Sequence, residues 1–454
     1  GRGLVVPPPF DMDGFTLMPE ESAVLRPCID AMEVNCESFG YDLDYIGPDG
    51  GEESAEAQAE EQAIDTFFLT INDRVSWVHI RRKLRVDLET TGNAYLEIIR
   101  TLDGEIVQVE HLPSFTVRLC PLDREAVYVD VELVGAKGVL VKRRVPHRFR
   151  RFLQMQDMRR VWFKEFGDPR DVEWKTGRVV NPMDPQASGD QPETSPKAKK
   201  DPDTLDLATE IIHFKLYTTR SPYGMPRFVG NVLGMRGARK AQRVNHDYFD
   251  NFAIPPCAIM ISGGGMTEDS SIDLKRYFET IRGVKNYNRP LVIEAVPENG
   301  GLDGKGAISM QLKSFQDIRL SDAQFLKYID SANQELRQAF RLPAIYSGES
   351  TDYNFATAQA SRVTAEEQIF AVERDAFDEV INLQLMRAKG FRFWRFFSKG
   401  PEIADVDTYT AAITVFNSVG AMTANQAIKL ANELLGTTLE AIDEPWGNYP
   451  FVLV

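Results

Sequence analysis

The chain has 454 residues, of which 43% are hydrophobic and 26% are charged, and its formal net charge at pH 7 is -15. This length and composition indicate a globular protein of about two to four domains. The negative charge argues against simple, tight nucleic-acid binding, because that binding depends on Lys and Arg side chains that neutralise phosphates. No apolar run approaches the roughly 20 residues that a membrane-spanning helix needs, so we expect no membrane partner.

The N-terminal part is predicted to start with helices and to continue with strands. Apolar residues at helical spacing predict helices over Phe15–Phe39 and Ser54–Asn72, and a third helix that starts near Trp77. From Asn93 the pattern changes to alternation, which predicts antiparallel strands around the turn at Asp103-Gly104. Further strands are predicted at residues 126–134, 139–145, 151–154, 162–170 and 210–215.

The segment Asn181–Asp203 is rich in Pro, Asp, Ser and Lys and has almost nothing to bury, so we expect a mobile insertion loop. After it, Ser221-Pro222 introduces a predicted helix that ends near Phe252, before Pro255-Pro256. A small α/β insert follows. Its predicted elements are strands at 257–262, 291–296 and 308–312 and a helix at 271–282.

Two strongly helical segments, Ala323–Leu342 and Ala356–Lys389, flank a short polar break at Ser347–Phe355. Pro343 ends the first helix, and Gly390 stands where a C-terminal cap belongs. Periodicity alone also fits two core helices of an ordinary domain, although a helix of more than thirty residues without proline favours an assembly. In the first helix, the apolar side is predicted to carry Phe325, Leu326, Ile329, Leu336 and Phe340.

Past Gly390, Phe391–Phe397 alternates as a strand, and two short helices are predicted at Asp407–Ser418 and Thr423–Leu435. Basic residues crowd one stretch of the N-terminal part, at residues 142–160. We consider five of its arginines a possible basic interface: Arg143, Arg144, Arg148, Arg150 and Arg151. The stretch fits either a solvated, ion-paired surface or a nucleic-acid patch.

The motifs of enzymes and metal sites are missing from the sequence. The five histidines are scattered, and the four cysteines contain no C-x-x-C pair, so we predict no metal site and free, mostly buried thiols. Gly263-Gly264-Gly265 is followed by Met266 and Thr267 instead of a phosphate-binding lysine. No nucleophile motif or recognisable pair of catalytic carboxylates occurs. We therefore predict no enzymatic activity and no cofactor.

Five stretches, taken together and in this order, resemble the portal proteins of tailed bacteriophages. They are Asp87–Arg100 (DLETTGNAYLEIIR), Trp162–Arg170 (WFKEFGDPR), Ser221–Phe228 (SPYGMPRF), Asp250–Pro256 (DNFAIPP) and Arg341–Gly348 (RLPAIYSG). The resemblance implies a ring of about twelve subunits at one capsid vertex, with a central channel through which double-stranded DNA enters and leaves. It covers nearly the whole chain.

The resemblance also implies an α+β portal fold with named parts. These are a β-rich wing (1–220, with the mobile loop 181–203), two paired stem helices (221–253 and 317–343), a small α/β clip (254–316), a tunnel loop (344–356), a long tunnel helix (357–390), and a wing return with a short helical crown (391–454).

Within these parts, the residues expected nearest DNA are those of the tunnel loop: Ser347, Gly348, Glu349, Ser350, Thr351, Asp352, Tyr353, Asn354 and Phe355. This loop has no Lys or Arg, and Glu349 and Asp352 would repel phosphate, so we predict a low-friction constriction. On the second stem helix, Lys327, Gln334 and Arg341 repeat every seven residues, which fits stacked rings along the lumen or a solvated, ion-paired face.

The partners implied by the resemblance are further copies of the chain, the terminase large subunit, a head–tail adaptor, and the major capsid or scaffold protein. The implied location is the virion, after assembly in the cytoplasm of a bacterial host. The alternative function is a nucleic-acid-binding packaging enzyme that uses the basic patch at 142–160.

Overall fold

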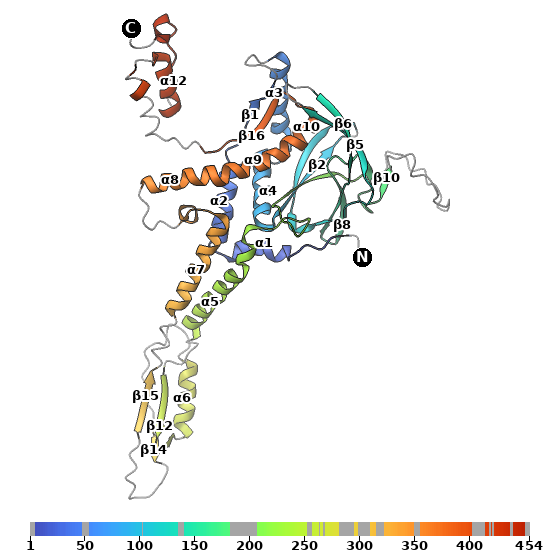
Figure 1. The fold of residues 1–454 in the computed structure, drawn as a ribbon. Helices are drawn as coiled ribbons and strands as arrows, with labels where there is room; N and C mark the ends of the chain where they lie inside the picture. The colour runs from blue at the N-terminus through green and yellow to red at the C-terminus, as the bar shows by residue number, and fades with distance from the viewer. Residues whose placement is uncertain are drawn as a thin grey trace, which may run out of the picture. The chain divides into compact units, whose positions relative to one another are not determined.

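The computed structural model describes most of the chain, and the ribbon in Figure 1 shows how its elements are arranged. The described residues are 5–47, 54–101, 103–134, 140–181, 207–251, 257–262, 264–266, 268–280, 295–297, 309–314, 322–348, 355–401, 414–416, 419, 422–435 and 439–449. The chain divides into two compact units, Gly1–Lys399 and Gly400–Val454.

A six-stranded mixed sheet forms the centre of the first unit, in the order β3-β2-β11-β8-β7-β4. Its strands are β2 (Asn93–Arg100), β3 (Ile106–Leu112), β4 (Val117–Leu119), β7 (Arg151–Gln156), β8 (Arg159–Glu165) and β11 (Glu210–Lys215). β11 pairs antiparallel with β2 and parallel with β8, so it joins two parts of the chain that are distant in sequence. The predicted strand 210–215 is confirmed, as is the hairpin around Asp103-Gly104.

Alternate residues of the sheet face two different cores, as the period of two requires. Leu96, Ile98 and Phe214 pack with helices α3 (Ala55–Thr70) and α4 (Trp77–Thr91). Tyr95 and Ile211 point to the other face, where they pack with Phe152, Phe163 and Tyr223. Both faces of the sheet are therefore covered.

The predicted helix Phe15–Phe39 is wrong as a single element. The structure has two helices there, α1 (Met12–Glu21) and α2 (Leu25–Glu37). The break has a local cause, because the Ser22 hydroxyl accepts a hydrogen bond from the Leu25 N–H and so competes with a continuous helix.

Three of the two-stranded sheets of the first unit are formed by the following strands. β1 (Tyr41–Tyr45) pairs with β16 (Trp394–Ser398), which brings residues near the two ends of the unit side by side. β5 (Val127–Val134) and β6 (Leu140–His147) form a separate hairpin. β9 (Asp171–Val172) pairs with β10 (Val179–Asn181). The predicted mobile loop lies outside the described residues beyond Asn181.

A long helix, α5 (Val232–Asn251), and a second, α7 (Asp322–Phe340), run side by side (Figure 1). Between them in sequence, the described residues form one helix and four strands, and the strands form two antiparallel pairs, β12 with β15 and β13 with β14. Their bounds are β12 (Cys257–Ser262), β13 (Gly264–Met266), α6 (Glu268–Thr280), β14 (Ala295–Pro297) and β15 (Ser309–Ser314). The α/β insert predicted from the sequence is thus present.

The predicted helix Ala356–Lys389 is continuous but not uniformly α-helical. It runs as α8 (Phe355–Ala365), a π segment (Glu366–Phe370), α9 (Ala371–Val380), a second π segment (Ile381–Met386) and α10 (Arg387–Lys389). Gly390 ends it in a left-handed conformation, with φ of 82°. This confirms the predicted glycine cap.

In the second unit the described helix is α12 (Ala424–Leu435), close to its predicted bounds. The Asn425 side chain accepts from the Ile442 N–H and donates to the Ile442 carbonyl, which fixes the following segment against α12. Most of the predicted helix at 407–418 lies outside the described residues. No helix among the described residues is long and apolar enough to cross a membrane.

Candidate functional site

The contact between α5 and α7 is built from small residues. Ala238 and Ala241 of α5 pack on Ile329 and Ala332 of α7. A Cβ on Gly234 would stand 3.7 Å from that of Ala332, and a Cβ on Gly237 would overlap the Tyr328 hydroxyl. A side chain at position 237 would require the Tyr328 ring to move, because its hydroxyl occupies the space above the glycine.

The base of this pair is anchored in a larger apolar cluster. Leu336 and Phe340 of α7 pack with Phe228, which precedes α5, and with residues of α1, α2 and the long helix. The end of α7 is fixed as well. The Leu342 N–H donates to the Arg337 carbonyl and the Arg341 N–H to the Gln338 carbonyl, the pattern of a Schellman motif. Pro343 follows directly.

Lys327, Gln334 and Arg341, predicted as possible lumen residues, are all exposed. Ile329, Ala332 and Leu336 define the buried face of α7, and at about 100° per residue Lys327 and Gln334 lie on the opposite face. Arg341 directly follows the end of α7, so the helical period does not place it. Arg341 is in a left-handed conformation, with φ of 58°. Leu326, predicted on the apolar side of this helix, is instead 57% exposed.

The predicted tunnel loop is described only at its two ends. Ala344–Ser347 form one turn of 3-10 helix, and Gly348 ends it with φ of 80°. The Tyr346 ring contacts Phe370 edge-on, with 5.3 Å between the ring centroids. Phe355 is the first residue of α8. The residues Glu349, Ser350, Thr351, Asp352, Tyr353 and Asn354 lie outside the described residues.

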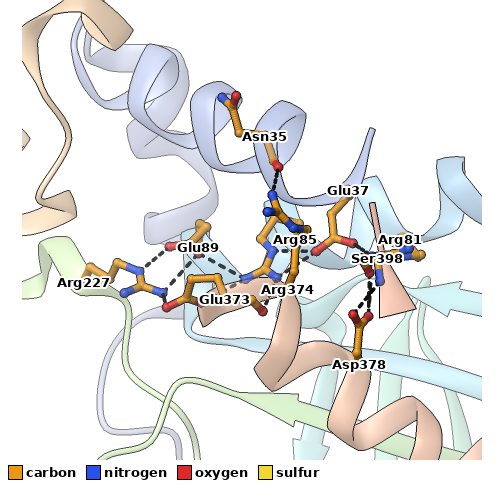
Figure 2. Close-up of polar contacts among 10 residues, drawn as sticks. All are labelled: Asn35, Glu37, Arg81, Arg85, Glu89, Arg227, Glu373, Arg374, Asp378 and Ser398. Atoms are coloured by element: carbon orange, nitrogen blue, oxygen red, sulfur yellow. Dashed lines mark hydrogen bonds and ion pairs between the residues drawn. The ribbon is translucent and has the colours of Figure 1, made fainter. Parts of the chain in front are cut away.

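A buried network of arginines and carboxylates joins α2, α4 and α9 (Figure 2). Glu37 at the end of α2 is 0% exposed and receives Arg85 Nη2 at 2.8 Å. Arg81 Nη2 lies 2.6 Å from Glu37 Oε2, as an ion pair and not an aligned hydrogen bond. Burial by itself would raise the pKa of Glu37, but the charges and hydrogen bonds of Arg81 and Arg85 outweigh it and lower the pKa.

The same network reaches the start of the helix pair. Arg227, just before α5, donates to Glu89 of α4 at 2.8 Å and pairs with Glu373 of α9 at 2.6 Å. Glu373 also pairs with Arg85, at 3.1 Å. These ion pairs therefore hold together α4, α9 and the segment before α5, which are far apart in sequence. Each charged group has its partners only when all three segments are in place.

At its other end the network includes Asp378 and Ser398 (Figure 2). The Ser398 N–H donates to Asp378 at 2.7 Å and its hydroxyl at 2.5 Å. Burial raises the pKa of Asp378, against the opposing effects of Arg81 and of these hydrogen bonds. The Arg81 guanidinium lies between the rings of Phe377 and Phe396, 5.4 and 5.5 Å from their centroids.

The network was missed at the sequence level. The available signal was the placement of Arg81, Arg85 and Glu89 at i, i+4 and i+8 on α4, on the same side as the apolar residues Trp77 and Leu84. Charged residues on an apolar stripe are buried only when they are paired. The partners of these three come from α2, α9 and the segment before α5, and sequence spacing does not reveal them.

The basic stretch divides into exposed and internally bonded arginines. Arg143, Arg144 and Arg148 are exposed, on the β5–β6 hairpin or just after it, and Arg144 is in register with Asp130 and lies over the Tyr128 ring. Two further arginines point inward. Arg150 donates to the Cys120 carbonyl at 2.8 Å, and Arg151 to the Gly177 carbonyl at 2.7 Å.

A cavity of about 690 Å³ lies beneath the β5–β6 hairpin. His213 borders it, stacks on Tyr95, and shares a hydrogen bond of 3.0 Å with Asn93. Burial, with smaller effects from Lys215 and Arg150, lowers the pKa of His213 to about 3, so the ring is neutral. Within the described residues, no group of three or more His, Cys, Asp or Glu side chains could hold a metal ion.

The described thiols are free and buried, at Cys28, Cys36 and Cys120. Burial raises the pKa of Cys28 to about 11, of Cys36 to about 12 and of Cys120 to about 11. Such thiols are not nucleophiles near neutral pH.

The fold defines a class of mixed α+β chains in which a helix pair carries a small insert and is followed by a long helix. Solved structures share this fold across almost the whole chain. A chain in the neck of a native gene transfer agent particle, computed with C12 symmetry, is 16% identical, with 96% of both chains covered and a TM-score of 0.52. A chain from the virion of a native gene transfer agent particle is 16% identical, with 97% of both chains covered and a TM-score of 0.51.

Sequence comparison gives the family. Residues 48–432 match the family of phage portal proteins, and the chain belongs to that family. Two proteins of Bacillus subtilis (strain 168) are each 32% identical to it. The uncharacterized protein YqbA matches over 98% of this chain and 85% of its own length. The phage-like element PBSX protein XkdE matches over 96% of this chain and 86% of its own length. The family is one of structural proteins, in agreement with the predicted absence of enzymatic chemistry.

Proposed function

We propose that this chain is the subunit of a portal ring, which forms a DNA channel at one vertex of a tailed-phage capsid. The observation that carries the proposal is the family match, which spans residues 48–432 and so includes the paired helices, their insert and the long helix. A ring of about twelve copies is favoured because a chain of the same fold belongs to a particle neck computed with C12 symmetry.

In this proposal α5 and α7 are the stem helices, within the predicted parts 221–253 and 317–343. The insert between them, 254–316, is the clip, and the helix from 357 to 390 is the tunnel helix. The wing is 1–220, and the segment 391–454 is the wing return and crown. The packing of α5 on α7 and the anchoring of both on α2 support a rigid stem.

The channel wall is proposed to be the exposed face of α7 that carries Lys327, Gln334 and Arg341. Support comes from the position of Lys327 and Gln334 opposite the face that packs on α5, which leaves them free to line a lumen. Residues 347–355 remain the proposed constriction, on the sequence argument alone. Glu349 and Asp352 would keep the constriction from holding phosphate.

The proposed partners follow from this position in a particle. The clip would dock the terminase large subunit during packaging and a head–tail adaptor afterwards, and the wing would contact the major capsid or scaffold protein. ATP hydrolysis would belong to the terminase. The location would be the virion, after assembly in the cytoplasm of the bacterial host.

The mass of the purified chain in solution tests the proposal. Native mass spectrometry should find a closed species of about twelve copies. A monomer that hydrolyses nucleotide or binds short DNA tightly would overturn the proposal in favour of a packaging enzyme that uses the basic stretch at 142–160.

A further inference from the structure

Large apolar side chains are exposed on two opposite sides of the α5–α7 pair. On α5, Leu233 is 82% exposed and Val244 is 49% exposed. On α7, Tyr328 is 45% exposed and Leu326 is 57% exposed. Exposed apolar groups that gather in this way mark surfaces that become covered in an assembly.

The period of the α-helix shows on which side of the α5–α7 pair each of these residues lies. Each residue turns the helix by about 100°, and the direction of the α5–α7 contact is fixed by Gly234, Ala241 and Ala332. Tyr328 lies over Gly237, so the Tyr328 side of α7 is continuous with the Leu233 and Val244 side of α5. We name this surface the first lateral face: Leu233, Lys240 and Val244 of α5 with Tyr328 and Glu335 of α7.

The same reasoning places Leu326 and Asp330 of α7 on the opposite side, which we name the second lateral face. The two remaining directions are polar. The face of α7 that points away from α5 carries Lys327 and Gln334, with Arg341 just past its end, and the face of α5 that points away from α7 carries Arg236, Arg239 and Arg243. Exposed apolar groups thus occur on the lateral faces and not in these two polar rows.

At nearly equal heights, the first lateral face carries Lys240 and the second carries Asp330, whereas Glu335 of the first face lies further along the helix pair. Gly234 lies beside Ala332, and the helices are antiparallel, so Lys240 is level with Leu326. Asp330 is then one turn away from Lys240, about 6 Å along the helix. Neither Lys240 nor Asp330 has an ion-pair partner among the residues that the structure describes.

We propose that the first lateral face of one copy packs on the second lateral face of the next. Lys240 of one copy would then meet Asp330 of its neighbour, and Val244 would cover Leu326. This inference rests on the proposed ring, because cyclic symmetry repeats one and the same contact between all neighbouring copies. Both pairs are offset along the helices by about one turn, roughly 6 Å, in the same direction.

The competing arrangement turns the α5 row of one copy toward the α7 row of the next. That contact would place Arg236, Arg239 and Arg243 against Lys327 and Arg341. Like charges would then face one another, and Glu21 of α1, which lies beside the α5 row, could offset only part of this repulsion. The lateral arrangement avoids this repulsion. It also leaves the α7 row facing the ring axis and the α5 row facing outward.

Charge reversal tests the interface. Lys240→Glu and Asp330→Lys should each lower the fraction of chains in rings several-fold at equal protein concentration, because every subunit contact is affected. The double variant Lys240→Glu/Asp330→Lys should restore ring formation. Arg243→Glu is the matched control on α5, since Arg243 is exposed at a similar height but lies in the outward row, and it should leave the ring fraction unchanged.

The outcomes distinguish a failure of the proposed interface from a failure of the proposed function. Rings that form equally well in both single variants, as measured by native mass spectrometry, would show that the lateral faces are not the interface, while the proposed function would stand. Absence of rings from the unmodified chain would contradict the proposed function itself. Loss of rings in the single variants without recovery in the double variant would refute the pairing of Lys240 with Asp330.

Discussion

At the residue scale, Glu37 is the group on which the buried network depends. It is fully buried and is paired with Arg81 and Arg85, which are themselves 0% and 1% exposed. Removing one partner of a buried pair leaves an uncompensated charge, which costs more than the pair itself contributes. The network therefore contributes most as a constraint on how α2, α4 and α9 are arranged.

Glu37→Gln should lower the free energy of unfolding by about 3–5 kcal/mol, because two buried guanidinium groups lose their carboxylate. Glu33→Gln is the matched control on the same helix. Glu33 pairs with Arg82, whose side chain is 40% exposed, so its loss should cost about 0–1 kcal/mol. Urea denaturation followed by tryptophan fluorescence measures both. Equal losses in the two variants would show that burial of the network adds nothing.

The lowered pKa of Glu37 also predicts that the free energy of unfolding depends on pH. Because the folded-state pKa of Glu37 lies below its ordinary value of 4.5, its contribution is fully present above pH 4.5 and is lost as the pH falls through the folded-state pKa. The unmodified chain should therefore lose more stability than Glu37→Gln on acidification from pH 5 to pH 3. Parallel losses would mean that Glu37 has the same pKa in the folded and unfolded chains.

At the element scale, the β7–β8 hairpin turns through residues that are unfavourable for its geometry. Asp157 has φ of 50° and Met158 has φ of 63°, and the Met158 side chain is fully exposed. Two positive φ angles in a two-residue turn are those of type I′, which favours Asp-Gly or Asn-Gly. Met158 makes no apolar contact that would offset the strain, because its whole side chain faces solvent.

Met158→Gly should accordingly raise the free energy of unfolding by about 1 kcal/mol, since glycine adopts the left-handed region without the Cβ clash. Met155→Gly, in the adjoining strand β7, is the control and should lower stability by about 0.5–1 kcal/mol. Thermal and urea denaturation of the three proteins provide the comparison. A destabilised Met158→Gly protein would indicate that the turn has a different conformation.

Elements set by local pattern were predictable from the sequence, and those set by distant partners were not. Glu210–Lys215 is a short run rich in β-branched and aromatic residues, and its strand bounds were predicted correctly. The break between α1 and α2 depends on a hydrogen bond from the Leu25 N–H to the hydroxyl of one serine, Ser22. The two π segments give no signal in the spacing of apolar residues along the sequence. Leu326 was assigned to the apolar side of its helix because it is apolar and stands next to Phe325, but the structure leaves it 57% exposed.

The same distinction holds for the candidate site. Lys327 and Gln334 could be placed on one helix face because a seven-residue spacing is local information, whereas the left-handed conformation of Arg341 after the helix end was not predicted. The pairing of Arg227 with Glu89 and Glu373 could not, since it joins residues from three separate parts of the chain. The family resemblance supplied the function that no residue pattern provided, and the family match confirms that resemblance.

At the scale of the whole molecule, the chain combines a net charge of -15 with basic rows confined to particular faces. A uniformly basic surface would hold DNA, whereas an acidic chain with a few cations on one helix face would let it move. This distribution supports the proposed DNA channel. It also places Lys240 and Asp330 on opposite lateral faces of the helix pair.

The most direct test of the central claim is a density map of the purified assembly from electron cryomicroscopy. The account predicts a closed ring with cyclic symmetry in which Lys327, Gln334 and Arg341 point toward the axis and the lateral faces of neighbouring α5–α7 pairs are in contact. A monomer, an open filament, or a ring in which these three side chains point outward would contradict it.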